Sequence, residues 1–332
     1  MAKIKVAING FGRIGRAAFK IMLDDSKYEV VAINDLAPAD ALAYLLKYDT
    51  IYGRYNKKVS TQDNNIIVNG KKYLVTAVPE PDKLPWKKLK VDVVLECTGR
   101  FVKSEQATLH IKAGAKKVII SAPAKGADVM TYLLGVNEKK YKNEKVISNA
   151  SCTTNCIAPV AQVMVDTFGV DKAMMTTIHS YTADQHLVDS PHKDPRRGRT
   201  AAQNIVPTTT GAAIATGQVI PDMEGLFDGL SIRVPTAVVS LADFTFVLKK
   251  NVTVEQVNKA LIKASQSPRL KNILGVTDEP VVSSDFIKDS RSSIVDLALT
   301  KVVGGNMIKI IAWYDNEWGY SNRLVEMIDS II

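Results

Sequence analysis

The chain has 332 residues, of which 46% are hydrophobic and 23% are charged. This composition excludes a disordered chain, and the length predicts two domains, each with a hydrophobic core. The formal net charge is +9, with basic residues scattered along the chain, so we expect a solvated basic surface and anionic ligands, and no specific nucleic-acid partner. No apolar run reaches the ~18–20 residues of a membrane span, and no signal-peptide core follows Met1, so we expect a cytoplasmic protein.

Short β-branched runs alternate with amphipathic stretches through the first 150 residues, a pattern typical of parallel βαβ units. We expect Pro38 at the first position of a helix, Ser104 as the cap of another, and Gly114 at its end. Two alternating runs around Asn69-Gly70 predict an antiparallel hairpin within 65–75, added to the parallel sheet. The predicted strands are 4–8, 29–34, 91–96, 117–121 and 146–148, and the predicted helices are 13–25, 38–48 and 104–113.

The strand 4–8 leads into a glycine-rich turn, Gly10-Phe11-Gly12-Arg13-Ile14-Gly15, that opens a helix. In a dinucleotide-binding turn the first glycine permits the bend, the second lets the backbone approach a pyrophosphate, and the third lets helix and strand pack closely. A second strand ends at Asn34-Asp35, where a carboxylate can accept hydrogen bonds from ribose hydroxyls and would repel a 2′-phosphate. We therefore predict a Rossmann domain that binds NAD rather than NADP; a purely structural glycine turn is the alternative. Thr98-Gly99 and Ser121-Ala122 end later strands, where they suit either the nucleotide or a simple strand-to-loop connection.

The pattern changes after Asn149. A predicted helix 152–168, closed by Gly169, precedes long β-rich runs at 233–249 and 306–314, and a helix at 253–265 opens with a capping-box pattern. We expect a second domain of the α+β class, with a mostly antiparallel sheet and helices on one face. The polar, aperiodic segment 183–205 is long for a loop without a use, so we expect it to serve a site or a subunit interface. A last helix, about 316–331, could complete either domain.

Three cysteines are too few for a disulfide scaffold, so we expect reduced thiols. Cys152 stands at the predicted start of a helix, where the macrodipole and free N–H groups can lower a thiol pKa from ~8.5 into the ~3.5–7.5 range. Cys156 lies one turn further along and is expected to be a buried, unreactive side chain. The sequence offers no second ligand cluster, so we expect no metal site.

Four histidines are present. His110 falls inside the predicted helix 104–113, where a packed or surface role is expected. His179 ends a strand-like run, 174–178, from which its ring could point across a domain interface at Cys152 and activate it. A structural histidine at a strand end is the alternative, and spacing alone leaves both open.

Motifs along the whole chain resemble phosphorylating glyceraldehyde-3-phosphate dehydrogenases. The cysteine motif is the most specific of them. Besides the glycine-rich turn they are Ser151-Cys152-Thr153-Thr154-Asn155-Cys156, His179-Ser180-Tyr181-Thr182, Pro207-Thr208-Thr209-Thr210-Gly211-Ala212-Ala213, Arg233-Val234-Pro235-Thr236 and Trp313-Tyr314-Asp315-Asn316-Glu317-Trp318-Gly319-Tyr320-Ser321.

The resemblance implies oxidation and phosphorylation of glyceraldehyde 3-phosphate with NAD, through a hemithioacetal and a thioester, in a homotetramer. It implies an NAD-binding domain at 1–151 with a C-terminal helix, 316–332, packed on it, and a catalytic domain at 152–315. Cys152 would be the nucleophile and His179 the base, and the 183–205 loop would reach a neighbouring subunit's cofactor site. The implied substrate- and phosphate-binding residues are Ser151, Thr153, Thr182, Arg197, Thr210, Gly211 and Arg233. The implied cofactor-binding residues are Gly10, Gly12, Arg13, Ile14, Gly15, Asp35, Thr98, Ser121, Asn316 and Tyr320.

Two positions depart from the family pattern. Val78-Pro79-Glu80-Pro81 stands where members often carry Arg-Asp-Pro beside the adenine, and Ser190 stands where NAD-specific relatives usually have Leu. Ser190 leaves limited NADP use open, while Asp35 favours NAD. The alternative functions are an erythrose-4-phosphate dehydrogenase, a Cys–His hydrolase or acyltransferase, which would not need the glycine-rich turn, and a non-catalytic binding protein.

Overall fold

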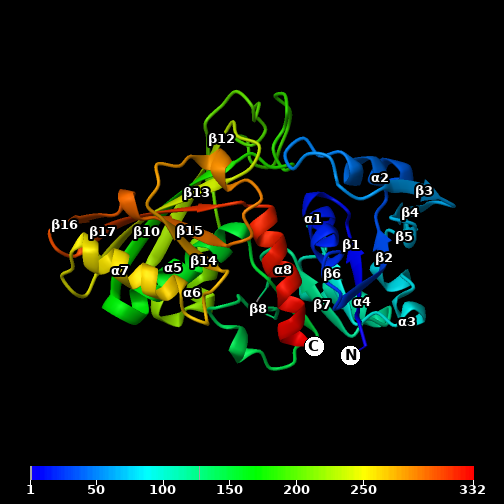
Figure 1. Cartoon of the computed structure of the whole chain (residues 1–332), viewed down its shortest axis with the longest axis horizontal. Helices are drawn as coiled ribbons and strands as arrows, with labels where there is room; N and C mark the ends of the chain where they lie inside the picture. The colour runs from blue at the N-terminus through cyan, green and yellow to red at the C-terminus, as the bar shows by residue number, and fades with distance from the viewer. Residues whose placement is uncertain (1, 127) are drawn as a thin grey trace. The chain divides into compact units, whose positions relative to one another are not determined.

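A computed structural model describes residues 2–126 and 128–332. The chain divides into two compact units (Figure 1). The first comprises Met1–Tyr132, Glu138–Ala150 and Ser321–Ile332, and the second comprises Leu133–Asn137 and Ser151–Tyr320. The second unit thus begins one residue before the expected boundary and keeps the first turn of the last helix.

The first unit is built on a mainly parallel sheet with the strand order β3-β4-β5-β2-β1-β6-β7-β9-β8. The central strands are buried along most of their length, as expected for a parallel sheet covered on both faces. The predicted hairpin is confirmed, because β4 and β5 pair antiparallel around Asn69-Gly70 while β5 pairs parallel with β2. The strands are β1 (Ile4–Asn9), β2 (Tyr28–Asn34), β3 (Val59–Gln62), β4 (Asn65–Val68), β5 (Lys71–Thr76), β6 (Val93–Glu96), β7 (Lys117–Ile120), β8 (Met130–Thr131) and β9 (Val146–Ser148).

The helices of this unit are α1 (Arg13–Met22), α2 (Ala39–Lys47), α3 (Trp86–Leu89) and α4 (Ser104–Lys112), with 3₁₀ turns at η1 (Pro81–Lys83) and η2 (Glu138–Lys140). The helix expected at 13–25 is three residues shorter. Two cap predictions were wrong by one position: Pro38 is itself the N-cap of α2, and Lys103, not Ser104, is the N-cap of α4. Pro38 is still extended, so α2 begins one residue later than expected. Lys103 is the extended residue before α4, so Ser104 is already helical and α4 begins one residue earlier than a Ser104 cap would give.

The last helix, α8 (Trp318–Ile331), contributes its residues from Ser321 onward to the first unit. Its Asp329 carboxylate accepts hydrogen bonds from Lys27 Nζ and Tyr28 Oη, both at 2.8 Å. Composition left the place of this helix open, and these contacts with the start of β2 settle where its C-terminal part lies.

The second unit is built on a mixed sheet in the order β11-β12-β10-β13-β17-β15-β14, with β16 pairing β17. Most pairs are antiparallel, as predicted, but β10–β12 and β14–β15 are parallel. The run expected at 233–249 is two strands, because residues 235–239 leave the sheet in a turn containing Pro235 and Val239 at φ +67°. The strands are β10 (Val170–Ser180), β11 (Val206–Thr209), β12 (Phe227–Val234), β13 (Ser240–Leu248), β14 (Leu274–Thr277), β15 (Ser293–Asp296), β16 (Lys301–Val303) and β17 (Met307–Tyr314).

Three helices, α5 (Cys152–Phe168), α6 (Ala212–Val219) and α7 (Val254–Ser265), lie on one side of this sheet (Figure 1). α5 has the predicted bounds: the Ser151 hydroxyl accepts a hydrogen bond from Thr154 N at 3.0 Å, and Gly169 follows the last turn. The capping box of α7 is confirmed, since the side chain of each of Thr253 and Gln256 accepts the other's backbone N–H. Short 3₁₀ turns occur at η3 (Pro221–Met223), η4 (Ser283–Phe286) and η5 (Leu297–Leu299).

The segment between β10 and β11 contains no helix or strand, in agreement with the aperiodic sequence. Ion pairs within the segment hold it, among them Arg199–Asp189 at 2.9 Å and Arg197–Asp184 at 2.7 Å. In the part of the chain that the structure describes, no helix combines the length and the hydrophobicity needed to cross a membrane.

Two glycines of the first unit allow a test of close backbone packing. Gly114 (φ +105°) and Gly126 (φ +103°) share a left-handed backbone, but a Cβ on Gly114 would lie 2.5 Å from Lys87 Cβ, whereas one on Gly126 would meet nothing within 4 Å. We expect Gly126→Ala to lower the free energy of unfolding by about 1–2 kcal/mol through backbone strain, and Gly114→Ala by about 1–3 kcal/mol more through the clash. Urea unfolding of both variants measures this, and equal losses would contradict the close approach to Lys87.

Candidate active site

A thiol and an imidazole meet in the second unit. Cys152 is the first residue of α5, and His179 lies near the end of β10, the neighbour of β13 in the sheet. The Cys152 Sγ atom lies 3.5 Å from His179 Nε2, which is hydrogen-bonding distance for sulfur. The structure therefore brings Cys152 and His179 together, which their spacing in the sequence could not decide. Both residues belong to the second unit and do not face each other from two domains.

Hydrogen bonding fixes which ring nitrogen of His179 carries the proton. His179 Nδ1 lies 2.7 Å from the carbonyl oxygen of Ser180, which can only accept, so Nδ1 donates. Arg233 Nη1 donates to the same oxygen at 3.2 Å and lies 3.1 Å from Nδ1. Nε2 is then the nitrogen with the free lone pair, and it faces Cys152.

Burial and charge keep this ring neutral. The side chain of His179 is buried, and desolvation, followed by the positive charge of Arg233, lowers the pKa of His179 to about 3. The ring is therefore unprotonated and able to accept a proton throughout the neutral range.

The same burial acts on the thiol in the opposite sense. Desolvation raises the pKa of Cys152 above its ordinary value, and the Arg233 charge, the Thr153 hydroxyl and backbone N–H groups of the first turn oppose it without reversing it. The expectation of a lowered thiol pKa was thus wrong for the free chain, because a helix N-terminus does not outweigh the loss of water around sulfur. The resting pair is a neutral thiol donating to a neutral imidazole.

A tyrosine that sequence reasoning did not single out lies beside the Cys152–His179 pair. Tyr314, on β17, places its hydroxyl 3.1 Å from Thr153 Oγ1 and 2.8 Å from Thr177 Oγ1, and its ring meets the His179 ring edge to face. It joins α5, β10 and β17 behind the thiol. The only signal was its place in the Trp313–Ser321 motif.

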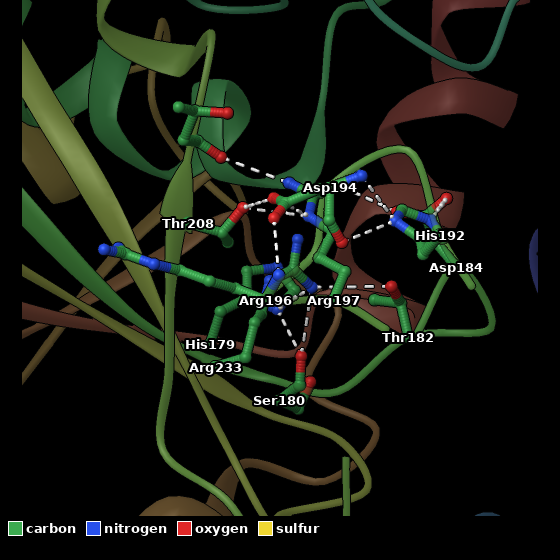
Figure 2. A network of polar contacts seen from close by, with 11 residues as sticks. His179, Ser180, Thr182, Asp184, His192, Asp194, Arg196, Arg197, Thr208 and Arg233 are labelled. Carbon is green, nitrogen blue, oxygen red and sulfur yellow. Dashed lines mark hydrogen bonds and ion pairs between the residues drawn. The ribbon is translucent and has the colours of Figure 1, made fainter. Parts of the chain in front are cut away.

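An arginine network adjoins the histidine (Figure 2). Arg233 Nη1 lies 3.5 Å from Thr182 Oγ1, and Arg233 Nε is buried without a hydrogen-bond partner among the residues that the structure describes. Burial lowers the pKa of Arg233, yet the group stays cationic because its ordinary value is so high. A half-buried guanidinium whose Nε–H has no partner among the described residues is suited to an anionic ligand.

Arg197 enters the network from the loop after β10. Its Nη1 donates to Asp184 Oδ2 at 2.7 Å, its Nε to Thr208 Oγ1 at 2.9 Å, and its Nη2 to the carbonyl oxygen of Thr209 at 3.2 Å. Asp194 accepts from Thr208 Oγ1 at 2.8 Å. Sequence reasoning assigned no role to Asp184, Asp194 or Thr208. Thr208 belongs to the motif that begins at Pro207, and for the two aspartates the polar density of the loop was the only hint.

The remaining predicted phosphate residues are less closely connected. Thr210 and Gly211 precede α6, where Thr210 Oγ1 accepts from Ala212 N at 3.2 Å and Gly211 is the N-cap. Ser151 is occupied as the cap of α5. Thr209, the residue before Thr210, accepts from Arg197 through its carbonyl oxygen.

The glycine-rich turn of the first unit has the geometry a dinucleotide needs. Gly10 has φ +92°, and a Cβ on Gly15 would lie 2.1 Å from the carbonyl oxygen of Gly10, so both must be glycine. A Cβ on Gly12 would meet nothing within 4 Å, which leaves open space at the N-terminus of α1 for a phosphate. Arg13 and Ile14 follow in the first turn, where Arg13 pairs with Asp49 at 2.7 Å.

Three further predicted residues stand at neighbouring strand ends in this unit. Asp35 follows β2, and its carboxylate accepts from Phe11 N at 2.7 Å and from Ala37 N at 3.0 Å, with lone pairs left for ribose hydroxyls. Thr98 and Ser121 follow the adjacent strands β6 and β7. Together with the glycine-rich turn, Asp35, Thr98 and Ser121 form what we call the cradle, at the carboxyl ends of parallel strands. These residues fit NAD.

Asn316 and Tyr320 belong to the second unit. The Asn316 side-chain oxygen accepts from Ser180 Oγ at 2.9 Å and from Ser240 Oγ at 3.1 Å, which orients the amide next to the strand that carries His179. Tyr320 is buried.

The other thiols are unsuited to catalysis. Burial raises the pKa of Cys97 and of Cys156 to about 12, and Cys156 Sγ lies 3.6 Å from Ser293 Oγ. Among residues 2–126 and 128–332 no cluster of His, Cys, Asp and Glu is arranged to hold a metal ion.

Both halves of the chain match known protein-family models. Residues 4–104 match the model described as glyceraldehyde 3-phosphate dehydrogenase, NAD binding domain, and residues 151–316 match that described as glyceraldehyde 3-phosphate dehydrogenase, C-terminal domain. The chain is 53% identical over 326 residues to a glyceraldehyde-3-phosphate dehydrogenase of Geobacillus stearothermophilus, covering 98% of this chain and 97% of that protein. It is 48% identical over 330 residues to glyceraldehyde-3-phosphate dehydrogenase 1 of Kluyveromyces lactis, covering 99% of each.

The raised thiol pKa gives a pH dependence that can be measured. Only the thiolate alkylates, so we expect the rate of Cys152 alkylation by iodoacetamide to rise about tenfold per pH unit between about pH 6 and 8 in the free chain. Because His179 is neutral above about pH 3, it adds no second step in this range. Peptide mass spectrometry gives the rate at each cysteine. A plateau from about pH 6 would show that a thiolate–imidazolium pair forms instead.

Proposed function

The chain belongs to the glyceraldehyde-3-phosphate dehydrogenase family, and we propose that it oxidises and phosphorylates glyceraldehyde 3-phosphate to 1,3-bisphosphoglycerate, with NAD as the cofactor. The observation that carries the proposal is the 3.5 Å approach of Cys152 Sγ to the unprotonated Nε2 of His179. This is the glycolytic reaction, and it proceeds through a hemithioacetal and a thioester on the cysteine.

Cys152 acts as the nucleophile. As its sulfur attacks the aldehyde carbon, His179 Nε2 accepts the thiol proton, because the lone pair of that nitrogen already faces the thiol. The new C–S bond leaves a negative charge on the former carbonyl oxygen, and His179 returns the proton there. The product of this step is a hemithioacetal on Cys152.

His179 then acts as a general base. Its Nε2 accepts the hydroxyl proton of the hemithioacetal as the hydride leaves the same carbon, and a thioester remains on Cys152. Bound NAD supplies the acceptor for that hydride. The Ser180 carbonyl holds Nδ1–H throughout, so the imidazolium that forms is stabilised by an existing hydrogen bond.

Two anion sites complete the reaction. Inorganic phosphate attacks the thioester carbon, the C–S bond breaks, and the acyl phosphate is released. Cys152 leaves as a thiolate and takes back the proton that His179 Nε2 holds, which restores the neutral pair. We assign the substrate's phosphate and the attacking phosphate to a set that contains both arginines and the neighbouring hydroxyls: Ser151, Thr153, Thr182, Arg197, Thr210, Gly211 and Arg233. The half-buried guanidinium of Arg233, whose Nε is unpaired among the described residues, supports this assignment.

We assign the cofactor contacts to Gly10, Gly12, Arg13, Ile14, Gly15, Asp35, Thr98 and Ser121 in the first unit and to Asn316 and Tyr320 in the second. Open space at Gly12 and the remaining lone pairs of Asp35 support the first set. We accordingly interpret 1–151, with the C-terminal helix, as the NAD-binding domain and 152–315 as the catalytic domain.

We further infer a homotetramer, in which the 183–205 loop reaches a neighbouring subunit. Exposed apolar side chains support an assembly: Leu187, Val188 and Ile205 on or beside that loop are 77%, 69% and 71% exposed, and Met174 is exposed on the open face of the second sheet. Light scattering should give about four chain masses, and a monomer at micromolar concentration would contradict the inference.

We also infer a cytoplasmic location, which three free thiols in the described residues favour. Recovery of the protein with secreted or membrane fractions of its cells would contradict this.

A single assay tests the proposed activity. NADH formation from glyceraldehyde 3-phosphate should require inorganic phosphate for turnover beyond one equivalent, and should be faster than with erythrose 4-phosphate. Cys152→Ser should retain less than about a hundredth of the rate, because a hydroxyl cannot replace the thiol as nucleophile. Phosphate-independent turnover, or an active Ser variant, would contradict the mechanism.

A further inference from the structure

The first unit contains a buried pair of ionisable side chains that has no role in the mechanism above. Glu96 is the last residue of β6 and only 1% exposed, and His110, on α4, is fully buried. The Glu96 Oε2 and His110 Nε2 atoms are 3.0 Å apart. A buried carboxylate is costly unless donors surround it, so its position calls for a physical reason.

Among the residues that the structure describes, every hydrogen-bond partner of the Glu96 carboxyl group is a donor. Its Oε2 accepts from Asn9 Nδ2 at 2.6 Å and from His110 Nε2, and its Oε1 accepts from Thr98 N at 2.8 Å and from Thr98 Oγ1. The Thr98 hydroxyl accepts from Arg100 N, so its own proton points to Glu96. Four donors and no acceptor indicate an ionised carboxylate.

Trp86 fixes the role of His110. The indole Nε1–H can only donate, and it lies 3.0 Å from His110 Nδ1, so Nδ1 accepts. The proton of the neutral ring is therefore on Nε2, directed at Glu96. His110 therefore donates to Oε2, whereas Thr98 donates to Oε1.

The bonds to Thr98 reach the glycine-rich turn. A Cβ on Gly10 would lie 2.8 Å from the carbonyl carbon of Cys97 and 2.8 Å from Thr98 N, so the turn packs directly on the Cys97–Thr98 peptide. Glu96 Oε1 holds the N–H of that same peptide. The carboxylate thus supports the surface on which Gly10 bends.

The bond to Asn9 reaches the strand end that carries Asp35. Asn9 Oδ1 accepts from Asn34 Nδ2 at 2.7 Å, and Asn34 Oδ1 accepts from Val78 N at 2.9 Å. One carboxylate is therefore connected to the ends of β1, β2, β5 and β6, and Asp35 is the next residue after Asn34.

We propose that Glu96, oriented by His110, is a positioning residue for NAD: it holds the strand ends so that Gly10, Asp35 and Thr98 keep the geometry that the dinucleotide requires. This inference rests on the proposed function, since it assumes that the cradle binds NAD. It assigns Glu96 and His110 no contact with the substrate and no part in proton transfer at Cys152.

Calorimetric titration with NAD provides the test. Glu96→Gln keeps the shape but turns one acceptor atom into a donor, so either the Thr98 or the Asn9–His110 bonds are lost. We expect NAD to bind at least about tenfold more weakly, as loss of hydrogen bonds to a charged group predicts. The turnover number at saturating NAD and the alkylation rate of Cys152 should stay within about twofold, because bound cofactor restores the cradle.

Two variants of His110 separate positioning from general stability. His110→Gln can place an amide donor near Glu96 and should keep the dissociation constant of NAD within about twofold, whereas His110→Leu lacks a donor and should weaken binding about fivefold or more. Tyr132→Phe is the matched control in the same unit. It removes the bond from Tyr132 Oη to Glu144 Oε1 at 2.8 Å, away from the cradle, and should lower the melting temperature without changing NAD affinity.

The outcomes are distinct. Failure of the unmutated chain to bind NAD would overturn the proposed function itself. Normal affinity in folded Glu96→Gln would overturn only the positioning role. If Glu96→Gln does not fold, the two His110 variants decide. Equal NAD affinities of His110→Leu and His110→Gln would overturn the proposal, and weaker NAD binding by His110→Leu alone would support it.

Discussion

The hydrogen bond from His179 Nδ1 to the carbonyl oxygen of Ser180 is the interaction on which the site depends. It places the ring proton on the side away from Cys152 and leaves the Nε2 lone pair facing the thiol. Arg233 reinforces it twice, by donating to the same carbonyl and by disfavouring a second proton on the ring. Without this bond the other tautomer would direct an N–H at the sulfur, and the same two residues could not transfer a proton in the required direction.

Desolvation sets the chemical state of that pair. It raises the pKa of the thiol and lowers that of the imidazole, so the resting site stores a proton on sulfur rather than a separated charge. The buried Glu96 in the first unit instead keeps its charge, because four hydrogen-bond donors compensate it. Burial therefore keeps the Cys152–His179 pair neutral but is compatible with an ionised Glu96. The difference is the number of N–H and O–H groups that donate to the Glu96 carboxylate.

Much of the fold was predictable because its determinants are local. The bounds of α5 follow from Ser151 and Gly169, the capping box of α7 from Thr253 and Gln256, and the β4–β5 hairpin from Asn69-Gly70. The errors also have local causes: the N-cap residues of α2 and α4 are each displaced by one position, and the turn at 235–239 splits what composition indicates as one long β-rich run. Parallel pairing of β10 with β12 could not be read from either strand, because it depends on which edge the chain returns to.

The sequence alone was sufficient for the glycine-rich turn, the cysteine at a helix start and the order of the motifs, since each is encoded within a few neighbouring residues. The tautomer of His179, the direction of the Cys152 pKa shift, the place of Tyr314 and the donors around Glu96 required the folded chain. These properties depend on atoms separated by many residues, such as Arg233 beside His179, Tyr314 beside Thr153 and Asn9 beside Glu96. The reason is that proton affinity responds to lost water and to nearby donors and charges, and folding creates both at once.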